Sequence, residues 1–343
     1  MRIDIPAPYR PYLRIGTCSW KYDSWKGLYY DAGTRYHADD YLADYARYLD
    51  SVEVDQWFWS LFPGGVRLPE PRTVSTYATS VPDDFKFTIK APNALTLTHF
   101  YARQPRHHVE FAGRPNIYFL DNELLERFLG LLAPLGDKIG PIMFQFEYLS
   151  RSKMPSCEVF LERFGEFITK APRGFDYSIE IRNPGYLSQR FFEALAGNGI
   201  GFVYLEGYHM PPIDTVFDRF QPATAAHSVI RLHGGDRLEI EKQTGEIWNR
   251  IVAPKPRGLQ AAVRIVRANM KRKIGTFVNV NNHFEGSAPV TVERFLALLK
   301  NGDIETPQKG EGGEASQDGD APRDGDAPRD GEQFDLFTDN EES

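Results

Sequence analysis

The sequence predicts an α/β protein in which a (β/α)8 TIM barrel over residues 1–300 is followed by a disordered acidic tail over residues 301–343. Eight short runs rich in β-branched and aromatic residues alternate with amphipathic stretches along the first 300 residues, as in a barrel. After residue 300 the composition changes abruptly. An open doubly wound sheet is the alternative, but no G-x-G-x-x-G motif follows the first run, so the barrel is favoured.

The predicted strands are short, and most are bounded by Gly or Pro. They are LRIGTCSW (13–20), SVEVDQWFW (51–59), FKFTIKAP (85–92), GPIMFQFE (140–147), FDYSIEIR (175–182), IGFVYLEG (200–207), HSVIRLHG (227–234) and IGTFVNVNN (274–282). Between and after them, apolar residues recur at helical spacing. The predicted helices cover residues 39–50, 124–136, 158–170, 189–199, 259–273 and 292–300.

The tail differs from the barrel in charge and in content. It holds 14 acidic and 3 basic residues, and subtracting these from the totals of 47 and 40 leaves a mildly basic body with 33 acidic and 37 basic residues. Gly, Pro, Asp and Glu dominate the tail, and the hexapeptide DGDAPR occurs twice in tandem at 318–329. Such a segment has too little apolar surface to offset its ordering entropy, so we expect an extended tether.

The cysteine count and the hydropathy pattern indicate a cytoplasmic protein. Cys18 and Cys157 are too few for a disulfide framework. The first residues carry no apolar signal region, and no run approaches 18 apolar residues, so neither export nor a membrane span is predicted.

Polar side chains recur where seven of the eight predicted strands end. Barrel enzymes build their sites at this end, and residues two apart on a strand share a face. Because buried charge is costly unless it is paired, the pattern predicts a site, with structural ion pairs as the alternative. The residues are Glu53 and Asp55, Lys90, Gln145 and Glu147, Glu180 and Arg182, Glu206, Arg231 and His233, and Asn279 and Asn281.

These residue types allow two kinds of ligand. Carboxylates and an imidazole are ligands for Mg, Mn or Zn, although no HExxH or CxxC spacing accompanies them, and the sequence does not decide whether a metal binds. The cations Lys90, Arg182 and Arg231 instead indicate an anion such as phosphate or carboxylate. The segments 233–235 (HGG) and 281–289 (NNHFEGSAP) follow the last two strands, where barrels commonly hold phosphate, but ordinary turn glycines explain them equally well.

Two further features are compatible with nucleic acid. Trp20, Trp25, Trp57 and Trp59 lie at or after the first two strands, where they could stack on bases or sugars, or could belong to the core or anchor loops. The long basic segment 99–116 could contact a polyanion or be a solvated loop.

Seven motifs together carry a family resemblance. GTCSWKYDSWKGLYY, SVEVDQWFW, FKFTIKAP, PIMFQFE, IEIRNPGYL, VIRLHG and VNVNNHFEGSAP occur in the order seen in the YecE-like family, domain of unknown function 72, which the chain resembles over residues 13–300. The resemblance implies a (β/α)8 barrel and supplies no reaction. The family's barrel is similar to those of endonuclease IV-type and xylose isomerase-like enzymes, but this chain lacks the His-rich set of a trinuclear zinc site.

The tail carries a second resemblance. QFDLF at 333–337 resembles the bacterial sliding-clamp-binding pentapeptide. Gln333 would provide orientation, and Leu336 and Phe337 would be apolar anchors for a pocket on the clamp. A tail end that folds back onto the barrel is the alternative.

The leading hypothesis is an enzyme that acts on nucleic acid or a related phosphate ester and that the tail recruits to DNA. The enzyme class this suggests is a metal-dependent phosphodiesterase or nuclease-like hydrolase. Glu53, Glu180, Glu206 and His233 would bind metal or exchange protons. A sugar or sugar-phosphate isomerase or lyase and a non-catalytic clamp-bound adaptor are the alternatives. The predicted substrate-binding residues are Lys90, Gln145, Arg182, Arg231, Asn281 and Asn282.

Overall fold

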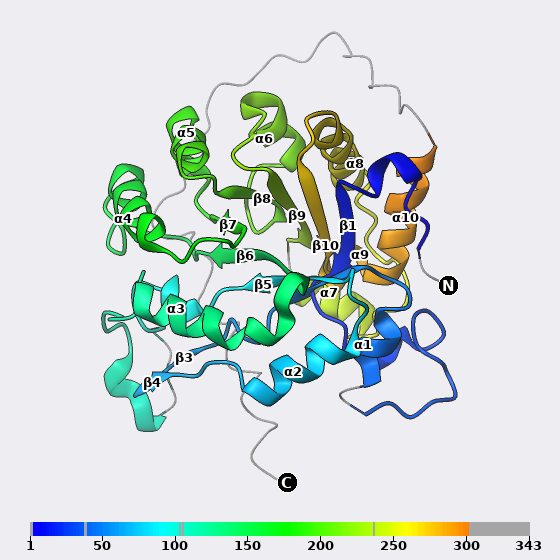
Figure 1. The fold of residues 1–343 in the computed structure, drawn as a ribbon, viewed down its shortest axis with the longest axis horizontal. Coiled ribbons are helices and arrows are strands. Elements are labelled where there is room, and N and C mark those ends of the chain that lie inside the picture. Colours follow the sequence, from blue (N-terminus) through cyan, green and yellow to red (C-terminus); the bar gives the residue numbers. More distant parts are fainter. Residues whose placement is uncertain (1–2, 38–39, 103, 105, 236, 302–343) are drawn as a thin grey trace.

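Eight parallel strands form the sheet of the structure, a computed structural model that describes residues 3–37, 40–102, 104, 106–235 and 237–301. The strand order is β1-β10-β9-β8-β7-β6-β5-β2, and β1 and β2 also contact each other, so the sheet curls into a nearly closed barrel (Figure 1). Each predicted run contains one strand of this sheet, and the predicted fold class is confirmed. The strands are β1 (Leu13–Thr17), β2 (Ser51–Val54), β5 (Lys86–Lys90), β6 (Ile139–Gln145), β7 (Tyr177–Glu180), β8 (Gly201–Gly207), β9 (His227–Gly234) and β10 (Gly275–Val280).

Helices surround the strands (Figure 1). They are α1 (Asp40–Tyr45), α2 (Pro71–Ser80), α3 (Asn122–Leu131), α4 (Cys157–Lys170), α5 (Gln189–Gly197), α6 (Ile213–Phe220), α7 (Arg237–Thr244), α8 (Pro256–Lys271), α9 (Asn282–Glu285) and α10 (Ala288–Lys300). All six predicted helices are present. The hairpin β3 (Leu61–Phe62) and β4 (Gly65–Val66) and the helices α2, α6, α7 and α9 are additional elements.

Three of the predicted helices begin at a side chain that caps them. Asp121 accepts a hydrogen bond from the backbone of Leu124 at the start of α3. Ser156 and Ser188 accept in the same way at the starts of α4 and α5. Each cap satisfies a backbone N–H that has no partner within the helix, so the loop after each strand ends where its helix begins.

Side chains close the barrel where β1 meets β2. The N–H of Ile15 donates to Oδ1 of Asp50 at 3.0 Å. The N–H of Thr17 donates to the hydroxyl of Tyr45 at 2.9 Å, and that hydroxyl donates to the carbonyl of Ser51 at 2.9 Å. Gly16 allows this approach, because a Cβ there would lie 2.2 Å from the same carbonyl oxygen. The Tyr45 phenol and the Asp50 carboxylate thus take the place of a backbone hydrogen-bond ladder between β1 and β2.

The barrel interior is layered. Met143, Val203 and Val229 form a small apolar cluster with Phe277 that is separate from the main core. Two residues further along three of these strands lie Gln145, Arg231 and Asn279, which share the inward face because side chains alternate along a strand. An apolar layer therefore lies beneath a polar layer at the C-terminal end of the barrel.

Two further predictions concern the acidic tail and membrane-spanning helices. The last helix ends at Lys300, and the predicted acidic tail from residue 302 onward, with Gln333, Leu336 and Phe337, lies outside the described residues. Within the part of the chain that the structure describes, no helix combines the length and the apolar character needed to span a membrane.

The side-chain contacts of Tyr45 and Asp50 that close the barrel between β1 and β2, which we call the side-chain seam, give a test of the fold. Tyr45→Phe leaves the buried N–H of Thr17 and the carbonyl of Ser51 without their shared partner, and we expect the free energy of unfolding to fall by about 1–3 kcal/mol. Chemical denaturation followed by circular dichroism measures this loss. Tyr48→Phe is the matched control on the same segment and should change stability by less than about 0.5 kcal/mol. Equal stability of Tyr45→Phe and wild type would contradict the role of the phenol.

Candidate functional site

Arg231 on β9 lies at the centre of the barrel mouth and is completely buried. Its Nε and Nη2 each donate to one carboxylate oxygen of Glu53 on β2, both at 2.8 Å. Its Nη1 donates to the carboxylate of Glu180 on β7 and to Oε1 of Gln145 on β6, the latter at 3.3 Å. One guanidinium therefore joins four strands, and the paired geometry on Glu53 matches the planar fork of Arg.

Three more side chains extend this network. Nζ of Lys90 lies 3.4 Å from Oε1 of Glu53, and Nδ2 of Asn279 donates to Oε2 of the same carboxylate at 3.1 Å. Nε of Arg182 donates to Oε1 of Glu180 at 3.1 Å. We call this network the charged ring; its members are Glu53, Lys90, Gln145, Glu180, Arg182, Arg231 and Asn279.

Charge compensation decides the ionisation of the ring. Burial alone would raise the pKa of Glu180, but the positive charges of Arg231, Arg182 and Lys90 outweigh burial and lower that pKa from its usual 4.5. Asp55, just beyond β2, behaves in the opposite way: burial, aided by Glu53, raises its pKa. The Glu180 carboxylate, which two guanidinium groups hold, therefore stays ionised.

Arg182 connects the ring to a second group of side chains at the mouth. Its guanidinium lies 3.8 Å from the centroid of the Tyr208 ring. The hydroxyl of Tyr208 is 3.5 Å from Nε2 of His233, and Nδ2 of Asn281 is 3.3 Å from the same nitrogen. Burial, with the charges of Arg231, Arg182 and Lys90, lowers the pKa of His233 well below its usual 6.5. His233 is therefore neutral at physiological pH.

An unusual backbone places Tyr208 over Arg182. Tyr208 and His209 have φ values of +51° and +58°, in the left-handed region that non-glycine residues rarely adopt. The preceding Gly207 has φ +137°, and a Cβ there would lie 1.9 Å from the carbonyl oxygen of Gly234. Strain of this kind is concentrated at functional sites, which supports a role for the mouth.

His283 and Glu241 extend the second group. Nδ1 of His283 is 2.6 Å from Oδ1 of Asn281, and its Nε2 is 3.1 Å from Oε1 of Glu241 on α7. Nε of Arg237 donates to the same carboxylate oxygen at 2.6 Å. A continuous path of polar contacts thus runs from α7 across Asn281 to the charged ring.

Most of the predicted site residues come together, but Asp55, Glu147, Glu206 and Asn282 are members of neither group. Glu206 is adjacent to the inward-facing position of β8, so it faces the helices, where it accepts from the N–H of Ile213 at 3.0 Å and lies beside Gly258. Glu147 pairs with Lys153 at 2.8 Å. Asn282 is buried, and its Oδ1 accepts from the N–H of Ala288 at 2.9 Å. Glu206 thus caps α6, and Asn282 supports the loop before α10.

The ring does not fit a divalent metal. The carboxylates of Glu53 and Glu180, which the sequence offers as ligands, are both engaged by Arg231, and two more cations lie beside them. A metal ion would have to displace these partners against like charge. Among the described residues, no three His, Cys, Asp or Glu side chains gather in a metal-binding arrangement.

The structure places three of the four tryptophans singled out in the sequence in the core and describes part of the basic segment 99–116. Trp20, Trp25 and Trp57 are buried, and Trp25 contacts the rings of Tyr22, Tyr29 and Tyr30, so these indoles belong to the core. Only part of the basic segment 99–116 can be described. In that part Arg114 lies over Phe111, and Val109 is 65% exposed.

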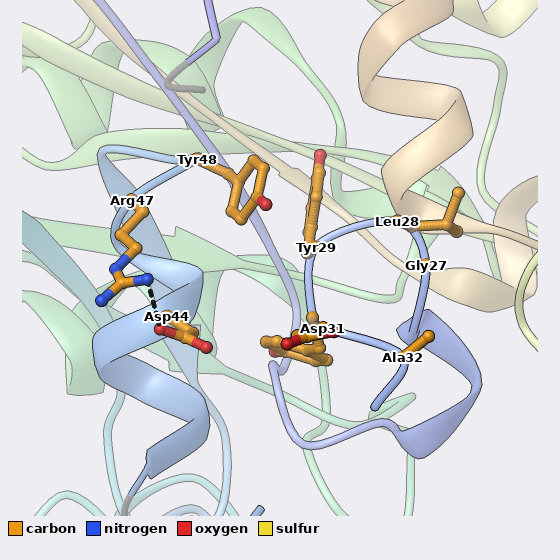
Figure 2. A pocket seen from close by; sticks show the side chains of 9 residues that line it. Gly27, Leu28, Tyr29, Asp31, Ala32, Asp44, Arg47 and Tyr48 are labelled. Atoms are coloured by element: carbon orange, nitrogen blue, oxygen red, sulfur yellow. Dashed lines mark ion pairs between the residues drawn. The ribbon is translucent and has the colours of Figure 1, made fainter. Parts of the chain in front are cut away.

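A hollow of about 300 Å³ lies away from the ring, between the loop 27–32 and the end of α1. Figure 2 shows the rings of Tyr29 and Tyr48 beside each other in it, near the ion pair of Asp44 with Arg47. The ring centroids of the two tyrosines are 5.1 Å apart. No predicted site residue lines this hollow.

Sequence reasoning missed Tyr208, Glu241 and His283. His283 lies inside the motif NNHFEGSAP and could have been singled out as an imidazole two residues after a strand-end Asn. Tyr208 directly follows Gly207 at the end of β8. Glu241 gives no signal, because it belongs to a helix with no predicted counterpart.

The family described as Protein of unknown function DUF72 matches residues 14–312. The UPF0759 protein YecE of Escherichia coli (strain K12) is 23% identical over 255 residues, which are 69% of this chain and 79% of that protein. A DUF72 family protein from Thermotoga maritima has a similar crystal structure, with a TM-score of 0.57, 21% identity and coverage of 84% of this chain and 99% of its own. For one from Enterococcus faecalis V583 the TM-score is 0.56, with 17% identity and coverage of 85% and 97%.

The lowered pKa of Glu180 predicts how stability depends on pH. A carboxyl whose pKa is lowered by folding stabilises the protein above its unfolded value, about 4.5, and this contribution is lost as pH falls through the folded value. We expect wild-type stability to exceed that of Glu180→Gln most at neutral pH, by about 3–5 kcal/mol, because Arg231 would lose a buried partner. Denaturant titrations from pH 3 to 7 measure the difference.

Glu166→Gln is the control for this experiment, because Glu166 is exposed on α4. It should follow the wild type at every pH. A Glu180→Gln deficit that stayed constant down to pH 3 would contradict the charge-based explanation.

Proposed function

This chain belongs to the DUF72 family of proteins of unknown function, and from that premise we propose that its barrel mouth binds and acts on a phosphate ester. The observation that carries the proposal is the state of Arg182. Its Nε is engaged by Glu180 and its face by Tyr208, while its two Nη groups have no hydrogen-bond partner among the described residues. Guanidinium nitrogens placed in this way bind phosphate or carboxylate oxygens.

Lys90 supplies a second donor at the same mouth. Its ammonium has three N–H groups, and one neighbour within salt-bridge distance is Glu53. The side chains of Lys90 and Arg182 are 10% and 19% exposed, whereas Glu53 and Arg231 are sealed beneath them. The two cations with some access to solvent would therefore receive the anion, and Arg231 would hold the floor of the site.

These contacts give revised roles to the predicted catalytic residues. Glu53 and Glu180 hold Arg231 and Arg182 in place, so we assign them as positioning residues. His233 and Asn281 border the same space and would contact the ester beside its phosphate. In a hydrolysis, water would form the new bond to phosphorus as the ester P–O bond breaks, and the leaving oxygen would end with a proton that water supplies.

Nucleic acid is the phosphate ester that the tail favours. The QFDLF peptide at 333–337 would bind a bacterial sliding clamp and keep the barrel at DNA, and the acidic residues around it would repel the DNA backbone from the tether itself. Recruitment of this kind raises the local concentration of substrate without any contact between the barrel and the clamp.

A sugar phosphate handled by an isomerase or lyase is the second candidate, and the depth of the ring favours it. Arg231 and Glu53 are inaccessible to solvent, so a small ester fits the mouth more easily than a duplex does. Both candidates share the phosphate group. Activity assays with single-stranded and branched DNA, and with a series of sugar phosphates, distinguish the two candidates. If the protein converts neither class of substrate, a non-catalytic adaptor is favoured.

Phosphate binding is the direct test of the mouth. Arg182→Gln should weaken the binding of inorganic phosphate by about tenfold or more, because a charge-assisted hydrogen bond contributes about 1.5–3 kcal/mol. Isothermal titration of the full chain measures the affinity. Arg190→Gln, which removes an exposed arginine from α5, is the matched control. Unchanged affinity in Arg182→Gln would refute the proposed site.

Clamp recruitment is tested with the full chain. We expect it to bind an immobilised bacterial sliding clamp with micromolar affinity, and Leu336→Ala/Phe337→Ala to abolish binding, because both apolar anchors are removed. Surface plasmon resonance measures the affinity. Equal binding of the two chains, or no binding by either, would remove the link to DNA.

A further inference from the structure

Two imidazoles lie on either side of the Asn281 side chain. Their ring centroids, in His233 and His283, are 6.4 Å apart and the rings are nearly parallel, at 14°. Nδ2 of Asn281 is 3.3 Å from Nε2 of His233, and Oδ1 is 2.6 Å from Nδ1 of His283. The amide can therefore impose a direction on the protons of both rings.

The backbone fixes the orientation of that amide. The N–H of His283 donates to Oδ1 of Asn281 at 2.9 Å, which caps α9 and identifies this atom as the oxygen. The amide nitrogen must then face His233. An amide nitrogen only donates, so Nε2 of His233 accepts and its proton lies on Nδ1.

His283 meets acceptors on both sides. Its Nδ1 faces the amide oxygen of Asn281, and its Nε2 faces the carboxylate of Glu241 at 3.1 Å. An imidazole donates from both nitrogens only when it is protonated. Burial would raise the pKa of Glu241, but hydrogen bonds from Arg237 and His283 lower it, so the carboxylate that faces His283 is ionised.

We propose that Glu241 and His283 are positioning residues that act on His233 through Asn281. Glu241 keeps His283 as an imidazolium, this cation and the backbone N–H orient the amide, and the amide holds His233 neutral with its proton on Nδ1. The mouth then presents one charged and one neutral imidazole at the same pH. The protonation states do not depend on the proposed function; only their use at the mouth rests on it.

Taken together, the charges around the two rings favour the same protonation states, a neutral His233 and a charged His283. His233 faces Arg231 from its own strand, Arg182 and Lys90 from β7 and β5, and the cationic His283, all of which disfavour a second proton. His283 faces Glu241 and Arg237 from α7 and the edge of the Trp248 ring at 4.9 Å between centroids. Among the described residues, the carboxylate of Glu241 is thus the group that favours the charged form of His283.

Nitrogen-15 NMR of the full chain labelled at histidine tests this assignment, because it reports the proton on each ring nitrogen. The two signals of interest are identified by their loss in His233→Gln and His283→Gln. At pH 7.5 we expect His283 to be protonated on both nitrogens and His233 on Nδ1 alone. A neutral His283, or a His233 protonated on Nε2, would overturn the proposal.

Two variants separate positioning from simple structural support. Glu241→Gln should lower the pKa of His283 by about one unit or more, because it removes the nearby negative charge. Asn281→Asp keeps the cap but replaces the donor with an acceptor, so His233 should gain a proton on Nε2. Glu239→Gln, on the exposed face of the same helix, is the control and should leave both histidines unchanged.

The outcomes distinguish this inference from the proposed function. If the NMR result is as expected and phosphate does not bind, the function fails and the protonation pattern stands. If neither variant changes either histidine, the positioning role is refuted whatever the protein binds.

Discussion

The buried guanidinium of Arg231 is the constraint on which the mouth of this barrel depends. It lies above an apolar layer and is surrounded by carboxylates from β2 and β7, strands that are not its neighbours in the sheet. A buried charge is tolerable only when its partners are fixed, so this one group requires the ends of several strands to be in register at once. An apolar plug would satisfy packing equally well, but it would impose no such requirement.

The charged ring also sets the character of the space above it. Because Glu180 divides its two oxygens between Arg231 and Arg182, the second guanidinium is held at the mouth through its Nε. Burial, together with these positive charges, lowers the pKa of His233 and keeps it neutral. Structural pairing therefore does not exclude the proposed ligand binding, because the fully buried residues form the floor while Lys90 and Arg182 keep some access to solvent.

The sequence predicted the strands better than the site. Alternation of apolar runs and amphipathic stretches identified every barrel strand, because the runs are short and most are bounded by Gly or Pro. It missed α2 and α6, whose Thr, Ser and β-branched residues are weak helix formers. The site was harder to predict. When a strand is buried on both sides, its sequence does not reveal which alternate residues face the barrel interior. Glu180 and Arg231 lie at the mouth as predicted, whereas Glu206 lies on the other face, as its neighbour Leu205 pairs with Arg231.

The closure of the barrel between β1 and β2 has a consequence for synthesis of the chain. β1 forms its ladder with β10 alone, so the first strand has no partner strand until residues 275–280 have been made. Until then Leu13 and Ile15 belong to an unpaired edge that can associate with other chains. Asp50 and Tyr45 are made early and can hold β1 beside β2 in the meantime. The side-chain seam would thus protect the nascent chain before it completes the barrel.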